Sequence, residues 1–497
     1  MKKLFTILAA LCCGIILSGC KQQNEPTPST DPTMPEIKRD YDVLTDWFAE
    51  AVKKCHPYMQ TMWSTDVLPA EFNLMLVNAE KTRVVAITPD GKQEIAQQDW
   101  TPEMGQCIAE LAGYAYTTYN NRPYTLILCE LESYEQKAMV MKEMFGIQMT
   151  DKDFVFQMLE LFYHESFHHF VQVGSKGWQK AGGQYSREQT YPVNMQPRIY
   201  RKLALLALKK AWDDPSSKSV QYARAKYWTA KYEKEYASEA AGIKSTDIDE
   251  ASAEYFSREV VHAAFPSQTL LYDIDTYNLG SLLETESYMG SIALHLMRRE
   301  NRLSEAVAAC KNQTLTPINA LLKDIAVPAT YDESQDASDI ARITKAAEAI
   351  NGDSSPFIAP MAALVKSHKE GKNNYLALKN QASGYFQSAG NYKLADLPGF
   401  NCAVLYETTG EVYEISGLTI LATTDYVLIP LADAGHLTLA NRTSGTGAST
   451  IPDVTVAETA QLTAIQGEDG LVLKQLPQPL LIGKDNYGNT YYICNHQ

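Results

Sequence analysis

Hydrophobic and polar positions recur with two different periods along this chain of 497 residues. In the first third, some segments repeat apolar residues every three to four positions, as amphipathic helices do. Others are short apolar runs between turn residues, as strands are. The segments predicted as helices are Pro35–Lys54, Pro102–Thr117 and Ser133–Met144, and those predicted as strands are Glu71–Asn78, Arg83–Thr88 and Tyr124–Glu130. A small mixed sheet accompanied by helices is therefore expected before residue 150.

Helical periodicity dominates the middle of the chain, and short strand-like runs dominate its end. The predicted helices are Asp153–Val173, Arg198–Trp212, Ser219–Ala241, Thr246–Phe265 and Ser281–Glu300, with more helix and loop from Leu303 to about Ala382. After about Asp396 the strand-like runs include Cys402–Tyr406, Leu418–Leu421, Tyr426–Ile429 and Tyr491–Cys494. The predicted class is α+β, with a mixed α/β region over 36–150, a helical domain over 151–395 and a C-terminal β domain over 396–497.

The first 35 residues differ in composition from the rest. A basic start, Lys2-Lys3, precedes the apolar run 4–17, and two small residues then precede Cys20. The run is too short to span a bilayer, and the arrangement resembles a bacterial lipoprotein signal. We expect residues 1–19 to be the signal peptide, Cys20 to carry the lipid, and residues 20–35 to be a disordered tether. The expected location is the periplasmic or cell-surface side of a membrane.

The net charge and the cysteine spacing argue against several classes of function. The formal net charge is −15, which argues against a nucleic-acid partner and against electrostatic adhesion to anionic lipids. An exported chain permits disulfides, but no C-x-x-C spacing occurs, which argues against a cysteine zinc site or a redox motif. The cysteines beyond Cys20 are Cys55, Cys107, Cys129, Cys310, Cys402 and Cys494.

The strongest chemical signal is the sequence His164-Glu165-Ser166-Phe167-His168. On a helix, positions i and i+4 share a face, so the two imidazoles can bind one zinc ion while Glu165 acts on a metal-bound water. Thr150 and Asp153 form a capping box before an apolar stripe of helical period, which predicts the helix around the motif. His169 points about 100° away from His168, so we expect it outside the ligand set. The alternative is a pair of helix histidines in ordinary contacts.

A catalytic zinc site usually needs a third protein ligand. The metzincin continuation is absent, because Val171 and Gly174 stand where that motif has Gly and His. The best candidate is Glu250, and the alternative is that Glu250 is an acid at the start of a helix capped at Thr246. Other acidic candidates are Glu239, Glu235 and Glu188.

Over about residues 153–299 the chain resembles the gluzincins, the thermolysin-like superfamily of zinc peptidases. Their second helix carries Glu-Ala-x-x-Asp, in which the Glu binds zinc and the Asp supports a zinc histidine. Glu250 matches the Glu and Glu254 stands at the Asp position, although the interval from His168 is longer than in thermolysin. The resemblance implies a zincin-like core whose sheet lays an edge strand along the substrate. It also implies a tyrosine that stabilises the oxyanion, for which Tyr288 is the candidate and Tyr277 the alternative.

These residues predict a Zn²⁺-dependent hydrolase, most simply a metallopeptidase. Zinc lowers the pKa of its bound water, and Glu165 would accept the proton as the water attacks a peptide carbonyl. The expected partners are a peptide or protein substrate and, through the lipid, a membrane. The alternative is a surface lipoprotein with an inactive zincin core that binds a protein or glycan through its C-terminal β domain. Glu165 discriminates between the two, because a binding protein has no need of that carboxylate.

Overall fold

The computed structural model describes most of the chain after residue 40. The described residues are 40–63, 68–111, 113–129, 150–173, 177–179, 189–271, 274, 283–351, 358–379, 385–409, 413–431, 437–444, 449–465, 471–473 and 480–494. The expected signal peptide, the tether and the predicted helix Ser133–Met144 lie outside them. The chain divides into two compact units, one from parts of 13–187 and 196–341 and the other from parts of 188–195 and 342–497. Helices and mixed sheets together confirm the predicted α+β class.

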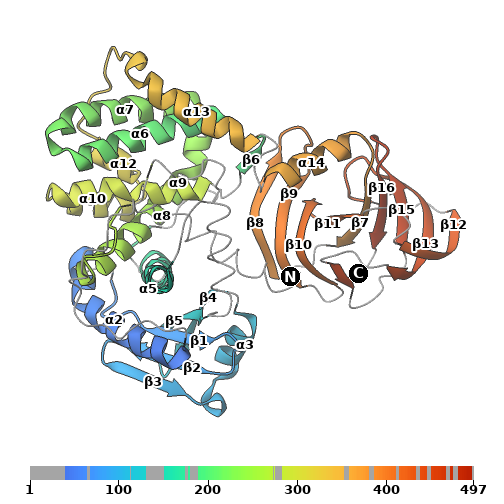
Figure 1. The fold of residues 1–497 in the computed structure, drawn as a ribbon, viewed down its shortest axis with the longest axis horizontal. Coiled ribbons are helices and arrows are strands. Elements are labelled where there is room, and N and C mark those ends of the chain that lie inside the picture. The colour runs from blue at the N-terminus through green and yellow to red at the C-terminus, as the bar shows by residue number, and fades with distance from the viewer. Residues whose placement is uncertain are drawn as a thin grey trace. The chain divides into compact units, whose positions relative to one another are not determined.

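Five strands of the first unit form a mixed sheet in the order β3-β2-β1-β5-β4 (Figure 1). β1 and β5 run parallel, and the other neighbouring strands run antiparallel, as a mixed sheet requires. The bounds are β1 Leu74–Asn78, β2 Val84–Thr88, β3 Gly91–Ile95, β4 Tyr114–Tyr119 and β5 Arg122–Cys129. The three strands predicted in this region are confirmed as β1, β2 and β5, so the small mixed sheet was predictable from the sequence.

The predicted helix Pro102–Thr117 is wrong in its second half. Helix α3 (Pro102–Glu110) is capped by the side chain of Thr101 and is followed by β4. The residues of β4 are mostly aromatic or β-branched, and such residues favour strands. Asn120 and Asn121 both have positive φ, as in the two-residue turns that join antiparallel strands. β4 therefore folds back on β5 and lies at one edge of the sheet formed by the described strands.

Helices make up the rest of the first unit. Their bounds are α2 Tyr41–Met62, α5 Asp151–Phe167, α6 Met195–Asp213, α7 Lys218–Glu235, α8 Ala237–Ala264, α9 Leu283–Met289, α10 Ser291–Arg299, α11 Leu303–Lys311 and α12 Pro317–Leu321. The chain passes from the first unit to the second within α13, Ala337–Asn351. A π-helical turn, His168–Val173, continues α5. Several ends differ from the predicted ones, and α7 stops at Glu235 although helix was predicted to Ala241. α2 continues past Pro57, and the helix predicted over Ser281–Glu300 is interrupted at Gly290.

Helix α8 contains a long, continuously buried stretch. Every residue from Ile248 to Val261 is buried, and the helix packs against α2, α5, α9 and α10. Figure 1 shows α5 end-on, with the sheet on one side and α8 on the other. α8 begins at Ala237, well before the predicted start, so Thr246 is a fully buried residue in the helix interior rather than its cap. The alternative that Glu250 is an acid at a helix start is therefore wrong.

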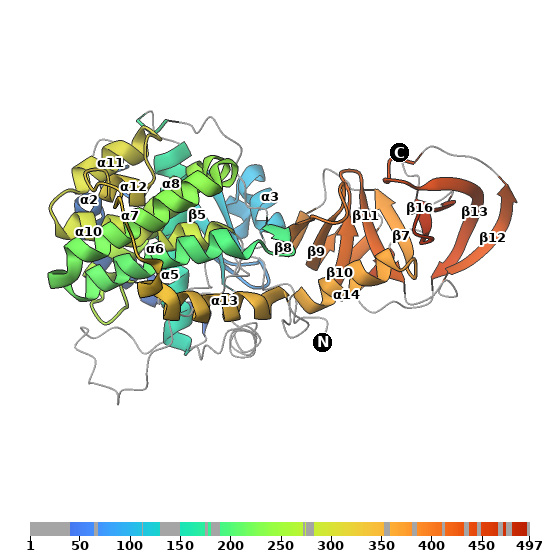
Figure 2. The same ribbon diagram turned by 90° about the horizontal axis from the view of Figure 1, so that it is seen from above.

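The second unit is built on a larger sheet, whose described strands follow the order β12-β13-β15-β16-β7-β11-β10-β9-β8-β6, with β14 beside β10. Helix α14 (Ile358–Lys369) packs on β9 and β10 (Figure 2). Both faces are apolar, since Tyr375 and Ala377 enter one buried cluster and Leu376 and Leu378 the other. The bounds are β6 Gln189–Tyr191, β7 Asn374–Lys379, β8 Tyr385–Leu394, β9 Asn401–Thr409, β10 Tyr413–Ala422, β11 Tyr426–Leu431, β12 Leu437–Ser444, β13 Thr455–Ile465, β14 Leu471–Leu473, β15 Leu480–Lys484 and β16 Thr490–Cys494.

The strand-like runs predicted after Asp396 are confirmed in β9, β10, β11 and β16. The prediction of helix and loop up to about Ala382 is wrong at β7, which pairs with β11 and, in parallel, with β16. A strand of six residues buried on both faces lacks the alternation that distinguishes a strand from a helix in sequence. Local sequence therefore could not identify β7.

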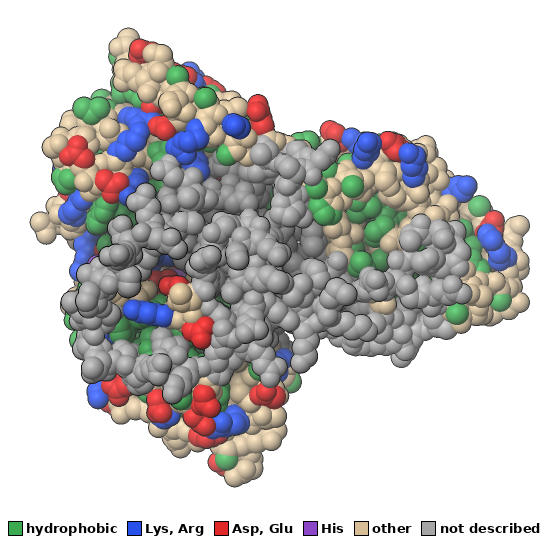
Figure 3. Space-filling view, viewed as in Figure 1, with side chains coloured by type: hydrophobic (Ala, Val, Ile, Leu, Met, Phe, Trp, Pro, Cys, Tyr) green, Lys and Arg blue, Asp and Glu red, His purple; other side chains and the backbone are tan. Residues whose placement is uncertain are grey.

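The described surface carries both signs of charge. On the face shown in Figure 3, acidic and basic side chains are interspersed. Cys55, Cys310, Cys402 and Cys494 are buried and carry free thiols, so these four positions form no disulfide. Across the part of the chain that the structure describes, no helix has the length and apolar character needed to cross a membrane.

Candidate metal centre

Helix α5 presents both motif histidines on one face. Its first turn is fixed by the predicted capping box, in which Thr150 Oγ1 accepts from the Asp153 backbone and Asp153 accepts from the Thr150 backbone. From this start the helical period brings His164 and His168 to the face that packs against α8. The capping box and the motif helix predicted from the sequence are thus confirmed.

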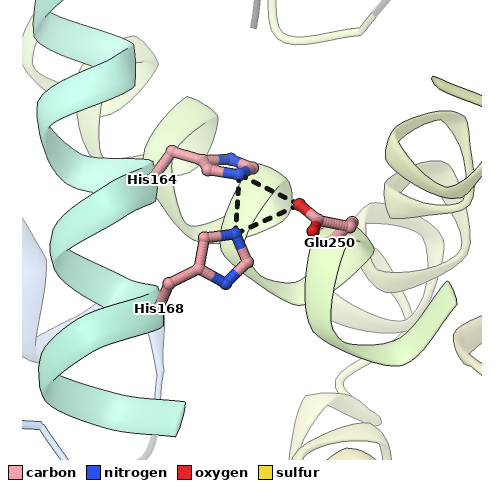
Figure 4. Close-up of side chains that lie close together, drawn as sticks. All are labelled: His164, His168 and Glu250. Carbon is pink, nitrogen blue, oxygen red and sulfur yellow. Dashed lines mark hydrogen bonds and ion pairs between the residues drawn. The ribbon is translucent and has the colours of Figure 1, made fainter. Parts of the chain in front are cut away.

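The side chains of His164, His168 and Glu250 converge on one point (Figure 4). The two Nε2 atoms are 2.9 Å apart, and Glu250 Oε2 lies 3.3 Å from His164 Nε2 and 3.1 Å from His168 Nε2. Tetrahedral zinc with bonds of about 2.0–2.1 Å separates its ligand atoms by about 3.3 Å. Two imidazole nitrogens and one carboxylate oxygen at these separations can hold such an ion. The three residues proposed from sequence as ligands are therefore brought together.

The other ring nitrogen of each histidine has its own acceptor. His164 Nδ1 lies 3.1 Å from Glu254 Oε2, and His168 Nδ1 lies 2.5 Å from Gln172 Oε1. A neutral ring with its hydrogen on Nδ1 carries a lone pair on Nε2. Both Nε2 lone pairs then face each other and the Glu250 carboxylate, and three acceptors so close together require a cation between them.

Without a metal, protons supply that positive charge. Burial opposes charging of His164, but hydrogen bonds with Glu250 and Glu254 outweigh it and raise its pKa to about 10. Burial likewise opposes charging of His168, and the Glu250 carboxylate raises the pKa of this histidine above its usual value. Metal binding would therefore displace protons from the same nitrogen atoms.

Glu250 and Glu254 are one turn apart on α8, a spacing at which two carboxylates repel each other. Here the imidazole of His164 lies between them, and Arg258 Nε donates to Glu254 Oε1 at 2.6 Å. Burial opposes ionisation of both acids, but the histidines lower the pKa of Glu250, and His164 and Arg258 lower that of Glu254. Both carboxylates are therefore charged in the folded protein, which suits one as a ligand and the other as a partner of His164.

Glu165 is buried beside the centre and is held by a tyrosine from the sheet. The hydroxyl of Tyr116, on β4, lies 3.1 Å from both Glu165 Oε2 and the Glu165 carbonyl oxygen, and donates to them. Burial and the Glu165 charge raise the pKa of Tyr116, so the hydroxyl keeps its proton. Its ring stacks on His169 with centroids 3.9 Å apart, so His169 lies outside the ligand set as predicted. Tyr116 was missed because its segment was predicted as helix.

Tyr288 approaches the centre from α9. Its buried ring meets the ring of His164 edge to face, with centroids 5.5 Å apart. Close packing at Gly290 holds this segment to α8, since a Cβ there would lie 3.5 Å from the Cβ of Ala251, the residue after Glu250. Of the two tyrosines considered from the sequence, Tyr288 is thus beside the ligands, and Tyr277 lies outside the described residues.

The competing acids have other partners. Glu239 pairs with Arg198, and Glu235 accepts from the hydroxyl of Tyr200. Glu188 lies outside the described residues. Gln172 was missed by the sequence reasoning, although its place four residues after His168 on the same helix was a usable signal.

No protein-family model matches the chain, and no curated protein or solved structure matches it at a significant level. The function is therefore argued from the geometry of the site.

Proposed function

We propose that this chain is a zinc-dependent peptidase of zincin type, in which His164, His168 and Glu250 hold the metal ion and Glu165 is the general base. The observation that carries this proposal is the convergence of three ligand atoms, 2.9–3.3 Å apart, from helices α5 and α8. Each histidine also has an acceptor at Nδ1, the arrangement that orients histidine ligands in metal sites. An incidental histidine pair needs neither feature.

Zinc, when bound, would act as a Lewis acid and lower the pKa of a water molecule. Glu165 would accept a proton from the attacking water and pass it to the leaving amide nitrogen. Tyr116 keeps the Glu165 carboxylate in one orientation through its hydroxyl. Tyr288, whose ring lies beside His164, is the proposed donor to the oxyanion.

The sheet gives a further argument for a peptide substrate. β4 is an edge strand, and its Tyr116 contacts the proposed base. Pairing of an extended peptide with an exposed sheet edge is a common mode of peptide recognition. A peptide that paired with β4 in this way would run past Glu165. This placement agrees with the zincin resemblance, in which an edge strand lies along the substrate.

The test is metal analysis combined with peptide cleavage. We expect about one zinc ion per chain in wild type and its loss in the His164→Ala, His168→Ala double variant. A broad peptide library at neutral pH should be cleaved by wild type only. Full zinc retention in the double variant would end the proposal. Zinc binding without cleavage of any peptide would favour the alternative of a binding protein.

A further inference from the structure

Gln172 makes a set of contacts that the proposed reaction does not use. It is buried in the π-helical turn after α5. Its Oε1 lies 2.5 Å from His168 Nδ1, and its Nε2 donates to the Asp249 carbonyl at 2.8 Å and to Ser252 Oγ at 3.1 Å. One side chain thus joins a proposed ligand on one helix to the backbone beside Glu250 on another.

The partners fix which end of the amide faces His168. A backbone carbonyl can only accept, so the atom facing Asp249 must be the NH₂ group. Ser252 Oγ donates its own hydrogen to the Ile248 carbonyl at 2.6 Å, which leaves it as an acceptor for Gln172. The Gln172 oxygen therefore faces His168 and accepts from its Nδ1–H.

This contact decides the state of the His168 ring. With the hydrogen held on Nδ1, the lone pair is on Nε2, the atom that lies 2.9 Å from His164 Nε2 and 3.1 Å from Glu250 Oε2. If the ring carried its hydrogen on Nε2 instead, an N–H donor would face the centre and that nitrogen could not bind a metal. The contact with Gln172 also prevents rotation of the ring away from the centre.

The two histidines are held in different ways by the same helix. His164 is held directly by Glu254 of α8, which is an anion. His168 is held by a neutral amide that is itself anchored to Asp249 and Ser252, on either side of Glu250. All three ligands therefore take their positions from one stretch of α8.

We propose that Gln172 is a positioning residue of the metal centre: it sets the tautomer of His168 and ties that ring to α8 beside Glu250. The proposal rests on the zinc site proposed above. It assigns to Gln172 two separable tasks, an acceptor task toward His168 and an anchoring task toward Asp249 and Ser252.

Substitutions at position 172 separate these tasks. Gln172→Met keeps the length of the side chain but loses both the acceptor for Nδ1–H and the amide donors, whereas Gln172→Glu keeps the acceptor and loses only the donors. The matched control, Ser252→Ala, removes one anchor and leaves the contact with His168. The zinc affinity of the full chain is measured by competition with a chelator, which needs no substrate.

We expect Gln172→Met to weaken zinc binding roughly 10- to 100-fold, as loss of a partner to a ligand histidine usually does. Gln172→Glu should weaken zinc binding less than Gln172→Met does, and Ser252→Ala should stay within about threefold of wild type. Equal weakening in Gln172→Met and Gln172→Glu would show a purely anchoring role and overturn the proposal, as would wild-type affinity in Gln172→Met. If Gln172→Met does not fold, Gln172→Asn, which draws the amide back by one methylene, must show the same weakening.

The outcome for wild type separates this proposal from the proposed function. A wild-type chain that binds no zinc overturns both. A wild-type chain that binds zinc, with an affinity that no change at Gln172 alters, overturns only the positioning role.

Discussion

Glu250 and Glu254 contact opposite nitrogens of the same imidazole ring. Glu250 Oε2 lies 3.3 Å from His164 Nε2, and Glu254 Oε2 lies 3.1 Å from His164 Nδ1. One helical turn of α8 therefore separates the two tasks that we propose for these residues, binding of a metal ion and orientation of a histidine that binds it. Because both residues are glutamates, the effects of the same substitution at the two positions can be compared directly.

Glu254→Gln should weaken zinc binding roughly 10- to 100-fold, because the ring of His164 loses its anionic partner but keeps its ligand position. Glu250→Gln should cost more, since it replaces an anionic ligand with a neutral one. Chelator competition measures both. Glu259→Gln is the matched control, because Glu259 is buried on the same helix but pairs with His295. Equal affinities for Glu250→Gln and wild type would mean that the third ligand is another residue.

Glu165→Gln should keep zinc and the fold while peptide hydrolysis falls about 10²- to 10⁴-fold, the usual cost of losing a general base. Cleavage of the peptide library and zinc content are measured on the same preparation. Ser166→Ala is the control, since Ser166 bonds to Thr125 and takes no part in the proposed chemistry. Undiminished hydrolysis by Glu165→Gln would remove Glu165 from the mechanism.

Tyr116→Phe should keep the stacking on His169 and lose only the hydroxyl that donates to Glu165. Because a buried carboxylate then lacks a partner, the free energy of unfolding should fall by about 1–3 kcal/mol, with zinc affinity unchanged. Denaturant unfolding measures this change. In a Glu165→Gln background the same substitution should cost less, because the amide is uncharged. Identical costs in both backgrounds would show that Tyr116 does not act through Glu165.

Glu160, one turn before His164, gives a pH-dependent prediction. Burial raises the pKa of Glu160 from 4.5 to about 7, against the opposing effect of Arg258. Between these two values the folded chain binds a proton that the unfolded chain does not, so the free energy of unfolding falls as pH rises. Glu160→Gln removes this contribution. Relative to wild type, the variant should therefore gain stability between about pH 5 and pH 8.

Urea unfolding at the two ends of that range, with chelator present in all samples, measures the gain. The exposed Glu50 of α2 provides a control, since Glu50→Gln should change stability by the same amount at both pH values. A stability difference between Glu160→Gln and wild type that does not vary with pH would contradict the prediction.

The lipid anchor predicted at Cys20, which precedes the described residues, can be tested separately. If Cys20 is lipidated, wild type should sediment with membranes, and Cys20→Ser should be released or should keep its signal peptide. Stable anchoring needs more than one acyl chain, so the expected modification is a multiply acylated cysteine. Fractionation followed by mass spectrometry of the N-terminal peptide reads out both points. Wild type found only in the soluble fraction would refute the lipid anchor.

Local patterns were enough to predict that the two motif histidines share one helix face, and to predict that helix and its capping box. Each of these features is decided within about one helical turn of sequence, which is the range over which periodicity and capping act. Glu250 and Glu254 were identified through the resemblance to the gluzincin motif, and their contacts with His164 depend on the packing of α5 against α8.

Tyr116 could not be found in that way, because its segment was predicted as helix and its contact with Glu165 joins a strand to a helix 49 positions later. Gln172 was within reach of the helical spacing from His168, but its contacts with Asp249 and Ser252 depend on the packing of α8. Residues that support a site through tertiary contacts leave little trace in one sequence.

The centre joins residues that are distant along the chain, since 82 positions and the helices α6 and α7 separate His168 from Glu250. An unfolded chain that gathered the ligands around an ion would lose the entropy of closing this loop, at a cost of about 4.5 kcal/mol. The folded chain has closed the loop through the packing of α5 on α8. A metal ion that bound the proposed ligands would therefore find them already assembled, whereas a peptide of α5 alone would hold it only through two imidazoles.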